Sequence, residues 1–128
     1  MRTLPLSLIL ASLIGCGDQA SPGVCTELFA SISVVVQTQA RVPVTGLIIS
    51  ATNLRTGQNF AVPQYLGGGP GTYTVFDDNF QDRIRASGDS VRVTGSDIAV
   101  RFTENFVIDV PGGCHVRKVA GPDTIMVQ

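Results

Sequence analysis

The sequence contains no tryptophan and only one histidine, and charged residues make up 15% of its 128 positions. Nine basic and ten acidic residues give a formal net charge of −1, so the chain has no bulk positive charge to attract nucleic acid. Long runs of helix-forming residues are missing, whereas valine, isoleucine, threonine and serine are abundant. With 14 glycines and seven prolines to form turns, this composition predicts short strands in one small domain.

Residue combinations typical of catalytic and metal sites are also scarce. His115 is the single histidine, and no Cys-x-x-Cys or His-x-His spacing occurs, so the sequence predicts no zinc site. There is no Gly-x-Ser-x-Gly elbow, and a hydrolase would have to use His115 as its general base. We expect a structural histidine, no catalysis and no cofactor. A hydrolase would require this imidazole to lie beside both a hydroxyl and a carboxylate.

Residues 1–15 are typical of an export signal. A short positive start, Met1-Arg2-Thr3, precedes an apolar run from Leu4 to Ile14. This run is shorter than the roughly 20 residues that a helix needs to cross a bilayer. It ends in Leu13-Ile14-Gly15-Cys16, which resembles the lipobox of bacterial lipoproteins: a leucine, a small residue before the cleaved bond and a cysteine after it.

The lipobox resemblance implies that Cys16 receives a diacylglyceryl thioether and becomes the first residue of the mature chain. Two acyl chains anchor a protein stably, whereas one chain binds a membrane only marginally. Residues 16–24 are polar and are predicted to form a tether. Gly17 is not the aspartate associated with inner-membrane retention, which implies the outer membrane in a cell with two membranes. An ordinary cleaved signal that contains a cysteine is the alternative.

Cys25 and Cys114 are the two thiols that remain when Cys16 carries lipid. An exported protein resides in an oxidising compartment, so this even pair near the two ends of the domain predicts a disulfide. In the chain-entropy model, closing a loop of about 90 residues stabilises a protein by up to roughly 4–5 kcal/mol. A reactive or metal-binding thiol is the alternative.

Short segments of alternating apolar residues run through residues 25–128. They predict strands at residues 30–37, 47–51, 59–62, 73–75, 91–94, 98–102, 106–110 and 124–128. A turn at Glu104-Asn105 is predicted to separate two of these strands. About seven to nine short strands in one domain predict an all-β fold, an antiparallel Ig-like or transthyretin-like β-sandwich.

Four segments of the chain resemble the carboxypeptidase regulatory-like domains of bacteria, which are transthyretin-like sandwiches. The segments are Cys25 with residues 30–36, residues 46–51, residues 71–75 and residues 113–116. The family is noncatalytic in most settings. The resemblance therefore implies a module for folding, display or adhesion rather than an enzyme.

Two polar clusters are candidate binding sites. The first is rich in oxygen and either holds calcium or lies in a solvated turn, since its spacing does not fit an EF-hand loop. It consists of Asp77, Asp78, Asn79 and Asp82. The second is basic and either forms a patch for anionic glycans or lipid headgroups or is the wet side of a sheet. It consists of Arg83, Arg85, Arg92 and Arg101.

These observations predict a noncatalytic envelope protein, bound to the membrane through lipid on Cys16, that presents a β-sandwich to another envelope protein or a surface polymer. A small-ligand or glycan-binding accessory lipoprotein is the first alternative. It requires a concave site with convergent polar groups, for example around Tyr65, Tyr73 and the arginines. A hydrolase is the second alternative.

Overall fold

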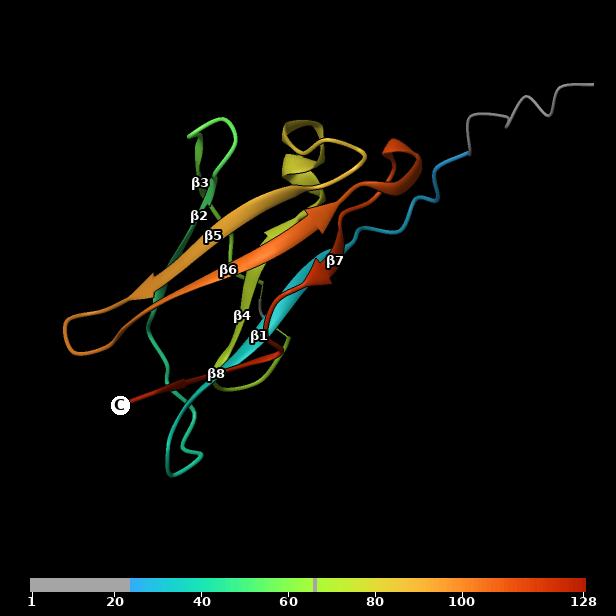
Figure 1. Cartoon of the computed structure of the whole chain (residues 1–128). Helices are drawn as coiled ribbons and strands as arrows, with labels where there is room; N and C mark the ends of the chain where they lie inside the picture. Colours follow the sequence, from blue (N-terminus) through green and yellow to red (C-terminus); the bar gives the residue numbers. More distant parts are fainter. Residues whose placement is uncertain (1–23, 66) are drawn as a thin grey trace, which may run out of the picture.

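The computed structural model describes residues 24–65 and 67–128, and Figure 1 shows their path. The predicted leader 1–15, the predicted lipidation site Cys16 and all of the tether except Val24 lie outside the described residues. Among the residues described, none of the helices has the length and apolar character needed to span a membrane.

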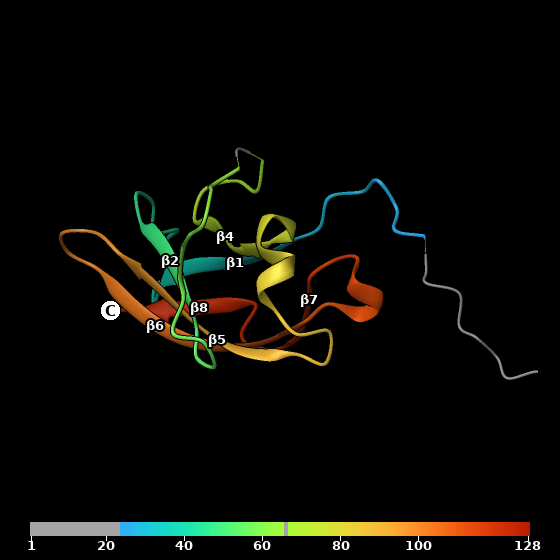
Figure 2. The ribbon, with the colours of Figure 1, turned by 90° about the horizontal axis from the view of Figure 1, so that it is seen from above.

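Eight strands form two sheets that pack face to face, so the predicted all-β sandwich is confirmed. The smaller sheet has the strand order β4-β1-β8 and the larger has the order β3-β2-β5-β6-β7. Seen from above in Figure 2, β1 and β4 form one layer, and β5 and β6 form the other. The strands are β1 (Ser31–Thr38), β2 (Ile48–Asn53), β3 (Asn59–Ala61), β4 (Thr72–Asp77), β5 (Asp89–Ser96), β6 (Arg101–Asp109), β7 (Arg117–Ala120) and β8 (Thr124–Val127). Two short 3-10 helices, η1 (Asp78–Arg83) and η2 (Pro111–Gly113), complete the elements of the described residues.

Pairing is antiparallel throughout the larger sheet and between β1 and β4, as the sequence predicts. The exception is β8, whose residues Thr124–Val127 pair in parallel register with residues 35–38 of β1. The last strand of the chain therefore extends the sheet that the first strand begins. Because the strand order ends at β8, its second edge carries no partner strand within the described residues.

The alternation of apolar residues determines which side chains enter the core. On β1, the side chains of Ile32, Val34 and Val36 are buried, while those of Ser33 and Val35 between them face solvent. Residues of β2 and β5 follow the same period. Burying a valine, isoleucine or phenylalanine side chain contributes about 1.5–3 kcal/mol relative to leaving it exposed. The inward faces of the two sheets therefore supply most of the stabilisation.

Two local predictions in the C-terminal half are wrong. Strand β6 runs without interruption through Glu104-Asn105, because both residues pair with β5 rather than turn the chain. Ile98 does not belong to a strand but lies exposed in the turn between β5 and β6. In that turn, the Asp97 side chain accepts hydrogen bonds from the N–H groups of Ala99 and Val100. At Ile98, the hydrogen bonds of the Asp97 side chain stabilise a turn where apolar alternation predicts a strand. At Glu104, pairing with β5 keeps the chain extended where the residue types predict a turn.

Candidate functional site

Three segments that are distant in the sequence meet at one end of the sandwich. They are the entering chain at residues 24–30, η1, and residues 114–116, which follow η2. The predicted disulfide between Cys25 and Cys114 is present and joins the first segment to the third, with Cα atoms 5.2 Å apart. The structure therefore places the start of the domain against its C-terminal part.

Asp78, the first residue of η1, forms hydrogen bonds with both of the other segments. One carboxylate oxygen accepts a hydrogen bond from the Ala30 N–H at 2.7 Å, and the other accepts one from the Val116 N–H at 2.8 Å. Desolvation raises the pKa of Asp78, but these backbone donors and His115 together outweigh it, so the pKa lies below its ordinary value. Asp78 is therefore an ionised acceptor at neutral pH.

His115 connects this carboxylate to a hydroxyl. Its Nδ1 lies 2.7 Å from Asp78 Oδ2, and its Nε2 lies 2.9 Å from Thr26 Oγ1. Because an ionised carboxylate only accepts, Nδ1 carries the proton in the neutral imidazole and Nε2 accepts from the threonine hydroxyl. Thr26, His115 and Asp78, here called the Thr-His-Asp chain, thus form the hydroxyl–imidazole–carboxylate arrangement that the hydrolase alternative requires.

No motif in the sequence points to Thr26, which lies 89 residues before His115. The signal that could have found it is the disulfide, because Thr26 follows Cys25 and His115 follows Cys114. Linking the two cysteines brings the next residues of both segments close together. The prediction of a structural histidine did not take into account that the disulfide brings Thr26 close to His115.

The oxygen-rich cluster does not converge on one point. Asp77 caps η1 by accepting from the Asn79 N–H and also accepts from the Tyr65 hydroxyl, both at 2.9 Å. Asp78 belongs to the junction described above, and Asp82 pairs with Arg83 at the surface. Across residues 24–65 and 67–128, no group of three or more acidic, histidine or cysteine side chains is arranged to hold a metal ion. These oxygens serve a helix cap and an ion pair.

The four arginines do not share one sheet face. Arg83 lies in η1 beside Asp82, and Arg85 precedes β5, where it pairs with Asp89. Arg92 on β5 and Arg101 on β6 are exposed on the outward face of the larger sheet. The predicted four-arginine patch is therefore not formed. Arg83 and Arg85 precede the start of β5 at Asp89, so they do not lie on the sheet that carries Arg92 and Arg101.

Asp89 is the centre of a buried polar network that the sequence analysis did not identify. Its side chain is inaccessible to solvent and accepts from Arg55 Nε at 2.7 Å, Arg85 Nε at 2.8 Å and Asn53 Nδ2 at 3.0 Å. Hydrogen bonding to the Arg55 guanidinium is the main cause that holds the pKa of Asp89 far below its usual range. The network ties the β2–β3 turn to the start of β5, which is a structural role.

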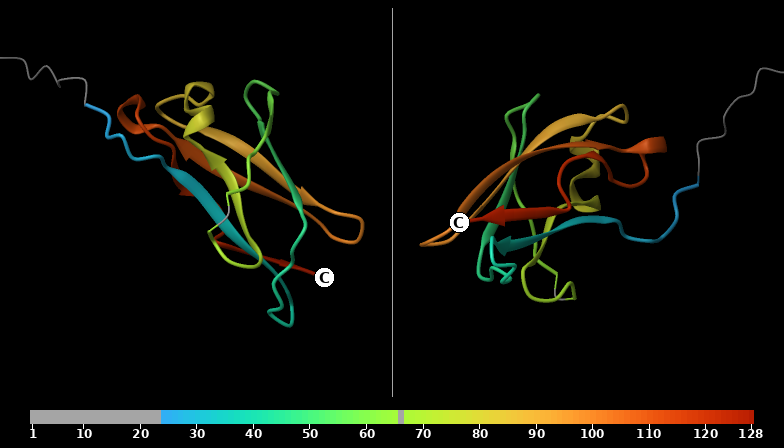
Figure 3. Two further views of the ribbon diagram at one scale, coloured as in Figure 1. Left: turned by 180° about the vertical axis from the view of Figure 1, so that it is seen from behind. Right: turned by 60° about the horizontal axis from the view of Figure 1, so that its bottom comes forward.

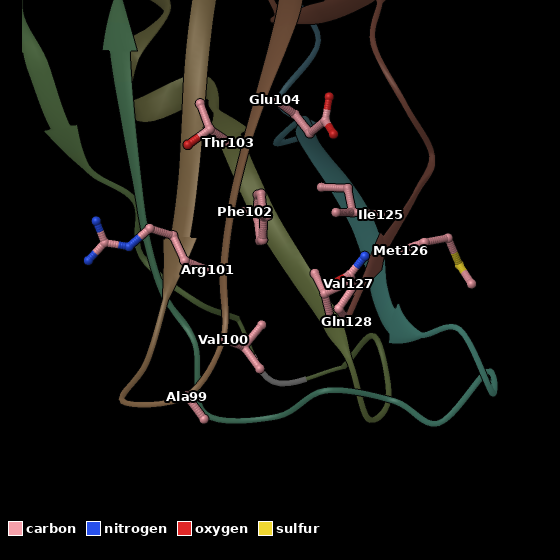
Figure 4. Close-up of a pocket in the computed structure, with 10 residues that line it drawn as sticks. All are labelled: Ala99, Val100, Arg101, Phe102, Thr103, Glu104, Ile125, Met126, Val127 and Gln128. Carbon is pink, nitrogen blue, oxygen red and sulfur yellow. The ribbon is translucent and has the colours of Figure 1, made fainter.

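Two grooves lie away from the Thr-His-Asp chain. The first, with a volume of about 440 Å³, is lined by residues 99–104 and by residues 125–128 at the end of β8 (Figure 4). The second, of about 320 Å³, lies beside the glycine-rich loop and includes Tyr65 and Tyr73. The Tyr73 hydroxyl is held within the fold, since it donates to Val44 O and accepts from the Leu47 N–H. None of the four arginines lines the second groove, so the predicted grouping of tyrosines and arginines is not formed.

Comparison with known proteins assigns no family to the chain. No protein-family model matches it, and no curated protein sequence or solved structure matches it. The lipoprotein and carboxypeptidase regulatory-like resemblances therefore depend on the sequence segments that carry them.

Proposed function

We propose that this chain is a noncatalytic lipoprotein of a bacterial cell envelope, anchored through lipid on Cys16, that uses its β-sandwich to engage another envelope protein or a surface polymer. The observation that best supports this proposal is the disulfide between Cys25 and Cys114. Structural disulfides persist in oxidising compartments outside the cytoplasm and are rare within it. Export is also what the apolar leader before Cys16 predicts.

The position of the entering chain supports a display role. Val24 is the first described residue, and both views of Figure 3 place the entering chain and the β5–β6 hairpin at opposite ends of the molecule. A membrane tether attached before Val24 would leave the hairpin and the ends of β1 and β8 directed away from the bilayer. The resemblance to carboxypeptidase regulatory-like domains agrees with a sandwich that is displayed rather than catalytic.

The anchor is tested by intact-mass spectrometry of the protein extracted from its native membrane. We expect the mass of residues 16–128 plus a diacylglyceryl group, with or without a third acyl chain, and with Cys25 and Cys114 oxidised. A Cys16→Ser variant should lose the lipid and remain uncleaved, because the lipoprotein peptidase requires the thioether. A lipid-free wild-type chain that starts at another residue would refute the anchor.

A second candidate function is ester hydrolysis, which the geometry of the Thr-His-Asp chain favours. Thr26 Oγ1 would attack the ester carbonyl carbon while His115 Nε2 takes the hydroxyl proton and then passes it to the departing alcohol. Water would next be activated by the same imidazole and release the carboxylic acid from Thr26. In the noncatalytic proposal, the same three side chains only clamp the entering chain to η1.

Hydrolysis of p-nitrophenyl acetate distinguishes the two functions. We expect Thr26→Val to leave the rate equal to that of wild type, because the clamp has no catalytic task. Thr45→Val, at an exposed threonine distant from His115 in the sequence, is the matched control. A rate that falls at least tenfold in Thr26→Val but not in Thr45→Val, with an acetyl group trapped on Thr26, would refute the noncatalytic proposal.

A further inference from the structure

We propose that the groove between β6 and β8 binds an extended peptide segment of a partner protein as an added β-strand, with a basic side chain of the peptide opposite Glu104. This inference rests on the proposed display function and names the chemistry of the partner. The groove is here called the β6–β8 groove, and its lining is shown in Figure 4.

The first reason is an open strand edge on β6. This strand pairs with β5 from Arg101 to Ile108, but it pairs with β7 only at residues 107–109. The hydrogen bond from Asp97 N to Val100 O shows which residues of β6 direct their N–H and C=O groups toward β5, because hydrogen-bonded and non-hydrogen-bonded pairs alternate along an antiparallel ladder. This alternation directs the main-chain groups of residues 101, 103 and 105 toward the side where β7 has not yet begun. An exposed row of such groups is a template for another strand.

The second reason is that β8 presents another open edge across the same groove. Val35 N donates to Asp123 O, and in a parallel ladder this directs the main-chain groups of Ile125 and Val127 toward β1. The groups of the alternate residues, Thr124 and Met126, therefore point away from β1. A peptide in the groove would continue the line of β7 along β6, with the open edge of β8 on its other side.

Three largely buried apolar side chains lie at the bottom of the groove, whose accessible lining is otherwise mainly polar. Figure 4 shows Phe102 from β6 and Ile125 and Val127 from β8 directed into the space between the two strands. The Phe102 ring packs directly over Gly95, where an added Cβ would meet the ring at 2.1 Å. In an added strand, every second side chain would face these three residues, and the side chains between would face away from them.

Glu104 determines the charge that the peptide should carry. It occupies an inward-facing position between Phe102 and Phe106, is half-buried, and points over the groove in Figure 4. Within the described residues, it makes no hydrogen bond or ion pair. A half-buried carboxylate without a partner gains most from an incoming cation. Lysine or arginine at the peptide position opposite Glu104 meets that need.

The probe is the synthetic peptide Ser-Gly-Thr-Val-Thr-Lys-Thr-Val-Thr-Gly-Ser, fluorescently labelled and titrated into the full, lipidated protein in detergent micelles. We expect it to bind at least about tenfold more tightly than the same peptide with glutamate in place of lysine. Glu104→Gln should remove this preference, and Glu104→Lys should reverse it. Glu27→Lys, which makes the same charge change on an exposed residue of the entering chain, should leave the preference unchanged.

Hydrogen exchange locates the bound peptide. We expect the lysine peptide to slow amide exchange at residues 101, 103 and 105 and to leave exchange in β3 unaffected. Absence of binding by every peptide, or an unchanged lysine preference in Glu104→Lys, would overturn the proposal. So would protection of these amides by self-association, since the groove would then accept a second copy of the chain. Intact mass of the same sample separates the two proposals, because lipidated protein that fails to bind overturns only the groove.

Discussion

Replacing both Cys25 and Cys114 with serine is expected to lower the melting temperature of the domain by about 8–20 °C. The disulfide closes a loop across a sequence separation of 89 residues, and loss of a native disulfide from a small domain typically costs roughly 2–5 kcal/mol. For a domain of about 100 residues, each kcal/mol corresponds to roughly 4 °C in melting temperature. The loss would come mainly from the greater freedom of the unfolded chain.

Thermal unfolding followed by circular dichroism of the full chain measures this effect. Wild-type protein treated with a reductant that reaches the disulfide should match the double variant. Thr26→Val retains the disulfide and loses only one hydrogen bond of the Thr-His-Asp chain, so its midpoint should shift by much less. A double variant that melts within about 2 °C of wild type would show that the disulfide contributes little beyond the hydrogen bonds of Asp78.

Asp89→Asn is expected to destabilise the fold by about 2–4 kcal/mol at neutral pH. The side chain of Asp89 is inaccessible and accepts charged hydrogen bonds from Arg55 and Arg85. Breaking a buried ion pair costs about 3–5 kcal/mol, but here both arginine side chains are more than one third exposed and regain water, which lowers the cost. Chemical denaturation by urea measures the difference in the free energy of unfolding.

The same substitution should change the response to acid. The folded-state pKa of Asp89 is depressed, so its stabilisation is complete above the unfolded-state pKa of about 3.9 and is lost as pH falls below that value. We expect wild type to lose stability below about pH 4 more steeply than Asp89→Asn. Glu27→Gln removes an exposed carboxylate and should follow the wild-type curve. Parallel curves for wild type and Asp89→Asn would contradict this role of Asp89.

The strands whose apolar residues alternate could be predicted from the sequence, because one face of each is buried by the opposite sheet. β1, β2 and β5 are of this kind. β7 was missed because it buries little of its surface and is placed by pairing with β6 and by the ion pair between Arg117 and Asp109. The parallel pairing of β8 was also missed, since strand direction depends on a partner at the other end of the chain.

A candidate site could be predicted from the sequence only where the residue type is so rare that few pairings are possible. With Cys16 assigned to lipid, two cysteines leave one pairing, and that pairing is present. The Thr-His-Asp chain and the β6–β8 groove have no such signature, because each is formed by segments that meet only after folding. In the groove, the missing stretch of β7 beside residues 101–105 creates the open edge, and no local pattern encodes that absence.

The parallel pair of β1 and β8 also sets the order in which the protein can be completed. A chain is synthesised from its N-terminus, so β1 emerges early, whereas the strand that covers its edge is the last of the eight described. The smaller sheet therefore stays incomplete until synthesis has delivered Thr124–Val127. A product that stops short leaves β1 with an open edge that proteases and aggregation can reach. The fold in this way makes its own stability depend on the arrival of its final strand.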